Sequence, residues 1–258
     1  MRHATRLLLA ILVTTASAAF ADVWDVSVTD NDNSSGTDNE LVHGGRQVHD
    51  LAASVLIPDQ DWYKVTSFPK SSHEVLVDGT TGDLGPGLTL ERVTAGGTVL
   101  QSSVPIAGGS GDSRSLRWIN GTTAVATEFV RVANAACGSL CSAVDQYSVR
   151  YYETSGAMVR FNNNATQVTV LQIQNPSSYT INGEVYFWSA GRVLLGTSPF
   201  QLTGKGQTVV NTATIAPGVS GHLTLVHDGR YGDLNAIAVA LEPATGFSFS
   251  YGMVVRPD

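Results

Sequence analysis

Apolar and polar residues alternate in short runs along most of this chain. In 147–151, for example, Tyr147, Val149 and Tyr151 share one face of an extended segment and Ser148 and Arg150 share the other. A period of two is typical of β-strands with one buried face. Turn residues such as Asp78-Gly79 separate the runs, and no window sustains the 3.6-residue period of a helix. The pattern predicts an all-β, antiparallel fold.

The expected strands fall into two groups. The first group covers 62–65, 74–79, 88–93, 99–104, 116–118, 129–132 and 147–151. The second covers 168–175, 184–189, 193–195, 207–211, 223–226, 236–241 and 247–251. About seven short strands in roughly 100 residues are typical of a jelly-roll or immunoglobulin-like sandwich. We therefore expect two consecutive β-sandwiches, 40–154 and 155–258, preceded by an edge strand and acidic lead-in at 22–39.

The first 21 residues have the pattern of a secretory signal peptide. A short basic region with Arg2 and Arg6 precedes an apolar run from Leu7 to Val13, and Ala19-Phe20-Ala21 fits signal peptidase. The apolar run is too short to span a bilayer. We expect export to the periplasm or the extracellular space, with no membrane insertion.

Net charge narrows the class of partner. Removal of residues 1–21 takes away two of the 15 basic residues and none of the 22 acidic ones, which leaves a net charge of −9. Nucleic-acid-binding proteins carry clustered basic faces, so this balance argues against nucleic acid as a partner. Cations, neutral glycans and proteins stay open, as does a role of the charge in solubility alone.

Two cysteines stand four positions apart. Cys137 and Cys141 lie in Cys-Gly-Ser-Leu-Cys, and no neighbouring histidine or third cysteine completes a tetrahedral metal site. In an oxidising compartment such a pair favours a disulfide that closes a small loop.

The candidate metal ligands are carboxylates. Asp30 and Asp32 lie in a lead-in without apolar residues, and Asp59 and Asp61 at i, i+2 would point the same way in an extended segment. Four such side chains suit calcium, although the lead-in does not have the spacing of an EF-hand. The alternatives are a solvated loop and a carboxylate pair for glycoside hydrolysis. No cofactor is required by any of these interpretations.

Other catalytic patterns are missing from the sequence. There is no G-x-S-x-G elbow and no H-E-x-x-H motif. His49 and Asp50 are adjacent and would face opposite sides of a strand, so they do not form a dyad. Trp62, Trp118 and Trp188 would stack on sugar rings if exposed, and burial in the sandwich core is the alternative.

Several of these segments together resemble the bacterial pre-peptidase C-terminal domain. The resemblance rests on Glu40-Leu41-Val42-His43-Gly44, Gln47-Val48-His49-Asp50-Leu51, Asp59-Gln60-Asp61-Trp62-Tyr63-Lys64-Val65, Leu88-Thr89-Leu90 and Asp145-Gln146-Tyr147-Ser148-Val149-Arg150. It covers residues 30–153 and implies a non-catalytic β-sandwich of the kind appended to secreted enzymes. Related collagen-binding modules hold calcium and grip an extracellular polymer. The lead-in here, Asp30-Asn31-Asp32-Asn33, departs from that family's Glu-Pro-Asn-Asp. The second half resembles β-sandwich domains of exported bacterial proteins of unknown role.

The sequence thus favours a secreted, non-enzymatic protein that binds an extracellular polymer, either glycan or protein, or a cell surface. Two alternatives stay open: a secreted hydrolase centred on Asp59 and Asp61, and a structural component of an envelope or extracellular assembly.

Overall fold

The fold is built almost entirely from antiparallel strands. The computed structural model describes residues 32–52, 59–82, 84, 87–106, 113–134 and 141–256. These residues form four antiparallel sheets, and their one short helical segment is the 3₁₀ turn Thr212–Thr214. The predicted all-β fold is confirmed. The signal peptide, the edge strand expected within 22–28, Asp30 and Cys137 lie outside the described residues, so the predictions made for them stay predictions.

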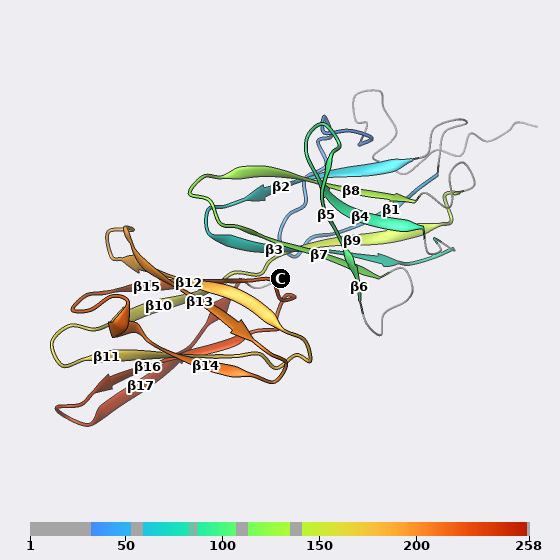
Figure 1. Cartoon of the computed structure of the whole chain (residues 1–258). Coiled ribbons are helices and arrows are strands. Elements are labelled where there is room, and N and C mark those ends of the chain that lie inside the picture. The colour runs from blue at the N-terminus through green and yellow to red at the C-terminus, as the bar shows by residue number, and fades with distance from the viewer. Residues whose placement is uncertain are drawn as a thin grey trace, which may run out of the picture.

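The N-terminal pair of sheets uses the strands up to residue 153. One sheet has the order β1 (Arg46–Asp50), β9 (Gln146–Glu153), β3 (Ser71–Gly79), β7 (Arg114–Asn120) and β6 (Val104–Pro105). The other has the order β2 (Gln60–Ser67), β8 (Ala126–Asn134), β4 (Leu88–Val93) and β5 (Val99–Ser102). Figure 1 shows the two sheets as adjacent layers.

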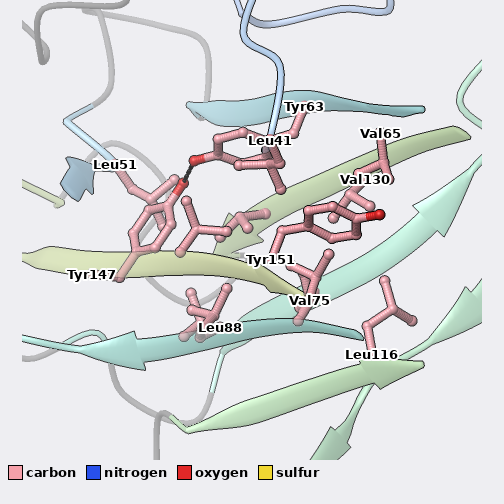
Figure 2. Close-up of a cluster of buried hydrophobic side chains, with 14 of the residues drawn as sticks. Leu41, Leu51, Tyr63, Val65, Val75, Leu88, Leu116, Val130, Tyr147 and Tyr151 are labelled. Carbon is pink, nitrogen blue, oxygen red and sulfur yellow. Dashed lines mark hydrogen bonds between the residues drawn. The ribbon is translucent and has the colours of Figure 1, made fainter. Parts of the chain in front are cut away.

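The core of this sandwich is formed by the alternating apolar positions. On β9, Tyr147 and Val149 are fully buried and Tyr151 is 5% exposed, while Arg150 between them is partly exposed. Tyr63 and Val65 of β2 reach the same cluster from the opposite sheet (Figure 2). Burying these apolar side chains removes them from water, which is the main force holding the layers together.

The C-terminal pair of sheets uses the strands from residue 156 onward. One sheet has the order β13 (Leu194–Leu202), β12 (Ile181–Ser189), β15 (Ser220–His227), β10 (Gly156–Asn162) and β18 (Val254–Val255). The other has the order β14 (Gln207–Asn211), β11 (Val168–Gln174), β16 (Asn235–Glu242) and β17 (Phe247–Gly252). A separate apolar cluster that includes Phe161, Leu171 and Phe187 lies between them.

Polar contacts join the two pairs of sheets. The main-chain N–H of Tyr231 donates to the Glu74 carboxylate at 2.7 Å, and Arg117 donates to the Tyr179 hydroxyl at 3.1 Å. The rings of Tyr152 and Tyr231 stack with centroids 4.5 Å apart. Residues from β3 and β9 therefore hold the loop between β15 and β16, and Arg117 of β7 holds the loop between β11 and β12.

Candidate metal centre

The acidic lead-in lies along the edge of β2. The N–H of Trp62 donates to the main-chain oxygen of Asp32 at 2.7 Å, and the N–H of Lys64 donates to that of Asn39 at 2.9 Å. The lead-in is thus positioned by strand-like hydrogen bonds. As a result, the Asp32 side chain is carried into the end of the sandwich, where the residue is 1% exposed.

Three potential metal ligands meet at this end of the sandwich. Asp32 comes from the lead-in, His49 from β1 and Asp61 from β2, and one ligand atom from each lies within 4.8 Å of the other two. The three residues are 1%, 1% and 0% exposed. Because β1 and β2 belong to facing sheets, the group closes the space between the layers.

Gln47 and Asp32 lie on either side of the His49 ring. Gln47 donates through Nε2 to the main-chain oxygen of Glu40 at 3.4 Å, which leaves its Oε1 facing His49 Nε2 at 3.0 Å. An amide oxygen only accepts, so His49 Nε2 carries the hydrogen. The other ring nitrogen, Nδ1, lies 4.0 Å from an Asp32 carboxylate oxygen. A histidine that ligates a metal through one nitrogen and donates through the other has this arrangement.

Two buried tyrosines support Asp61 and His49. The Tyr147 hydroxyl donates to Asp61 Oδ2 and lies 2.6 Å from the Tyr63 hydroxyl, the bond drawn in Figure 2. Burial, followed by the charge of Asp61, raises the pKa of Tyr147 well above its usual value, so this hydroxyl keeps its proton. The His49 ring meets Tyr63 edge-on at 5.1 Å and stacks on Tyr147 at 5.8 Å.

The donor set differs from the predicted calcium ligands. The structure brings Asp32 and Asp61 together and adds an imidazole, whereas Asp59 is not part of the three-residue group and its Oδ1 accepts from the N–H of Gln60 at 3.0 Å. Two carboxylates with one imidazole fit Zn²⁺, Mn²⁺ or Fe²⁺, while Ca²⁺ prefers oxygen ligands alone. Calcium at this position stays a prediction, now alongside a nitrogen-tolerant ion.

Sequence reasoning did not select His49 or Tyr147. It considered His49 only as a partner of Asp50, and Asp50 instead accepts from the N–H of Ala52 at 3.0 Å. The partner that matters lies across the sheet, because His49 and Tyr147 are paired in the register of β1 and β9. The signal available in the sequence was the D-x-Y segment ending at Tyr147, whose hydroxyl needs a partner once it is buried.

The tryptophans proposed as ligand-binding residues are mostly in the interior. Trp62 and Trp118 are 5% and 4% exposed, so neither offers a ring face to a polymer. Trp118 stacks on His73 at 5.1 Å, and the Trp62 ring lies 5.8 Å from the Arg131 guanidinium. Trp188 is partly exposed and stacks on His222. Trp118 belongs to the apolar core of the sandwich, whereas Trp62 lies beside Phe129 and Arg131 of β8.

The structure describes one of the two cysteines of the predicted disulfide. Cys141 is 8% exposed and belongs to the N-terminal apolar cluster. Its expected partner Cys137 lies outside the described residues, so the pairing stays a prediction.

Comparisons with known proteins do not assign the chain to a family. No family model matches the sequence, and no curated protein matches it. Among solved structures, a Bacteroides uniformis β-glucuronidase aligns at 12% identity and a TM-score of 0.20, covering 76% of this chain and 26% of that one. A glycosyl hydrolase family 2 member from Bacteroides cellulosilyticus aligns at 10% identity and a TM-score of 0.21, covering 79% of this chain and 28% of that one.

A Parabacteroides merdae β-glucuronidase aligns at 11% identity and a TM-score of 0.19, covering 75% of this chain and 28% of that one. The chain spans between a quarter and a third of the length of these three proteins. Within the described part of the chain, no helix has the length and apolar character needed to cross a membrane.

Proposed function

We propose that this chain is a secreted, non-catalytic binding or accessory protein that engages an extracellular polymer, with a divalent cation stabilising its N-terminal sandwich. The observation that carries the proposal is the sealed position of Asp32, His49 and Asp61, none of which is more than 1% exposed. A catalytic metal keeps an open coordination position for substrate, whereas a structural metal is enclosed by protein. This cluster has the enclosed arrangement.

Burial also weighs against the hydrolase alternative. Asp59 and Asp61, its proposed carboxylates, are 8% and 0% exposed, and Asp61 accepts from the Tyr147 hydroxyl. A glycosidase needs two carboxyl groups on either side of an accessible glycosidic bond. A polymer cannot reach this pair without opening the sandwich.

The proposal includes the resemblance to the pre-peptidase C-terminal domain for the N-terminal half. The segments that carry it fall within β1, β2, β4 and β9 and the lead-in to β1, all in the N-terminal sandwich. A cation held by Asp32, His49 and Asp61 would fix the lead-in to the sandwich. We regard such a fixed sandwich as a module that presents other surfaces for binding.

The test is retention of the mature chain, residues 22–258, on insoluble polymers. Cellulose, chitin, collagen fibrils and whole bacterial cells are each incubated with the protein, washed and eluted. We expect retention on at least one of the four and none on an inert resin. A protein that passes through all four would contradict the proposal.

The enzymatic alternative is tested in parallel on a panel of glycosidase and protease substrates. We expect no turnover from the mature chain. Turnover that disappears in Asp61→Asn, in a variant shown by circular dichroism to be folded, would overturn the non-catalytic assignment.

A further inference from the structure

The outer strand of the C-terminal sandwich carries a row of aromatic rings. Phe247, Phe249 and Tyr251 occupy alternate positions of β17, so their side chains share one face. Neighbouring ring centroids are 6.0 Å and 6.2 Å apart. Phe247 is 63% exposed, Phe249 is 45% exposed and Tyr251 is partly buried. Aromatic surface is thus held in a line at the edge of the molecule.

The row faces the gap between the two sheets. Tyr251 pairs with Ala238 of β16, and Ala238 is fully buried in the core. Residues that pair directly across a ladder point to the same side, so the rings point toward the facing sheet. That sheet leaves the rings partly uncovered, because β18 pairs with β10 only at Gly156 and Ala157. The register of β10 also shifts between Met158 and Phe161.

Polar side chains form the opposite wall of this opening. A pocket at this edge is lined by Arg160, Asn162, Gln167, Thr169, Ala240, Phe249 and Tyr251. Asn162 donates through its side-chain amide to Gln167 Oε1, and its main-chain N–H donates to the Thr169 hydroxyl at 2.9 Å. These bonds hold the wall in place before any ligand arrives. The Gln167 amide nitrogen is not used in its bond to Asn162.

We infer that this groove, between the β17 rings and the Arg160–Asn162–Gln167 wall, binds a glycan chain. Sugar rings have apolar C–H faces that pack on aromatic side chains and hydroxyl groups at their edges that bond to amides and guanidinium groups. The groove supplies both kinds of contact on opposite sides, in a line along a strand. Arg160 of the lining is available to a uronate, and the Glu242 carboxylate, which pairs with Phe247 and accepts from the Thr166 hydroxyl, lies at the far end of the row.

The mixed aromatic and polar lining favours a glycan over a second copy of the chain. A stable dimer buries about 800 Å² per partner with an apolar centre, whereas this groove offers two rings, Phe249 and Tyr251, beside a polar wall, with Phe247 next to them on β17. The inference rests on the proposed function and names its polymer as a glycan and its surface as the C-terminal sandwich. The N-terminal cation cluster is not involved.

The experiment is isothermal titration of the mature chain with four soluble probes: cellohexaose, chitohexaose, xylohexaose and hexagalacturonate. We expect at least one to bind, and we expect Phe249→Ala to weaken that binding about tenfold or more, as for a residue at the centre of a contact. Gln167→Ala should weaken it several-fold. Phe68→Ala, at a Phe that is 49% exposed on the other sandwich, is the matched control and should leave binding unchanged.

The outcomes separate this inference from the proposed function. Retention on a polymer that is equal for the wild type and Phe249→Ala would overturn the groove and leave the proposed function standing. Failure of all four probes to bind would also overturn the groove, as would a dimer in solution that Phe249→Ala dissociates. If Phe249→Ala lowers the melting temperature, Phe247→Ala, at a more exposed ring, is used in its place. Binding that is unaffected by Phe247→Ala would then overturn the groove.

Discussion

Removal of the Tyr147 hydroxyl should destabilise the folded protein. The residue is fully buried, donates to Asp61 and contacts the Tyr63 hydroxyl. We expect Tyr147→Phe to lower the free energy of unfolding by about 1–3 kcal/mol, because two buried polar groups each lose a partner. Urea denaturation measures this. Tyr231→Phe, which removes a hydroxyl bonded to the exposed Arg256 carbonyl, should cost under about 0.5 kcal/mol. Equal costs for both variants would contradict the role of the buried network.

The His49 imidazole should decide which ion the sandwich accepts. We expect Zn²⁺ or Mn²⁺ to raise the melting temperature of the chelator-treated protein. At an ion concentration 100 times Kd, the free energy of unfolding should increase by about 2.7 kcal/mol. His49→Ala should remove most of that increment. His222→Ala, at a histidine stacked on Trp188 in the other sandwich, should keep it.

Calcium serves as the contrasting ion in the same melts. A rise with Ca²⁺ that persists in His49→Ala would indicate a site of oxygen ligands alone, as the sequence predicts. A melting temperature unaffected by all three ions and by chelator would remove the cation from the proposal.

His73 should make stability depend on pH. Its ring contacts the hydroxyls of Ser67, Ser71 and Tyr151. Burial, followed by the charge of Arg92, lowers its pKa from 6.5 to about 4. The unfolded chain therefore takes up this proton first. Stability is fully present above pH 6.5 and falls as pH drops toward 4, by on the order of 3 kcal/mol for this group.

Urea denaturation between pH 7.5 and 4 checks this dependence. His73→Gln should show a shallower decline than the wild type, whatever its stability at pH 7.5. The decline should not vanish, because burial also lowers the pKa of His227 to about 4. Burial raises the pKa of the Glu74 carboxyl. This group therefore lowers stability above the usual carboxyl pKa, and its contribution improves as the pH falls toward that value. An unchanged slope in His73→Gln would exclude this histidine as the titrating group.

Period-two alternation predicted which face each residue of a strand occupies, but not how deeply a face is buried. Tyr147, Val149 and Tyr151 fall on one face as the pattern requires. Trp62 and Trp118 were open to either exposure or burial, since depth depends on which strand becomes central. The meeting of Asp32, His49 and Asp61 depends on pairing between strands and between sheets, which local pattern does not encode.

Two glycines of similar local structure should respond differently to a methyl group. A Cβ at Gly221 of β15 would fall on the main-chain oxygen of Trp188 and lie 3.0 Å from the Phe161 ring, whereas one at Gly252 of β17 meets nothing within 4 Å. We expect Gly221→Ala to lower the free energy of unfolding by about 2–3 kcal/mol, because β12 and β15 must separate. Gly252→Ala should be close to neutral. Similar denaturation midpoints for the two variants would contradict this account of the β12–β15 contact.

Strand boundaries show where local pattern is insufficient. The run 99–104 predicts one strand, but the structure divides it: β5 pairs with β4 in one sheet, and β6 pairs with β7 in the other. β10 was not predicted, because its register shift between Met158 and Phe161 breaks the period of two. β13 continues to Leu202 past Pro199, which an edge strand tolerates.

Contacts between the two pairs of sheets should couple their unfolding. Tyr231 stacks on Tyr152 at 4.5 Å and meets His43 edge-on at 5.8 Å. We expect Tyr231→Ala to remove about 0.5–1.5 kcal/mol of this coupling and to separate the calorimetric transitions of the two sandwiches by a few degrees. Tyr231→Phe keeps the ring and should reproduce the wild-type trace. Identical traces for Tyr231→Ala and the wild type would show that the polar contacts alone join the two pairs.

The architecture of the whole molecule was the most predictable level. Turn residues and alternation occur throughout the chain, so many weak local signals add up to one all-β assignment, which the structure confirms. The contacts joining the pairs were not predictable, because residues such as Glu74 and Tyr231 are distant in the sequence and carry no pattern of their own.

The bond between Tyr147 and Asp61 joins residues 86 positions apart, and this has a kinetic consequence. Asp61 obtains this donor only after the sheet that contains β9 has packed on the sheet that contains β2, a non-local step that we expect late in assembly because long loops are costly to close. An ion captured by Asp32, His49 and Asp61 would then bind after the rate-limiting barrier. Bound ion should slow the unfolding rate and leave the folding rate nearly unchanged. The cluster would therefore prolong the lifetime of the native state without directing its formation.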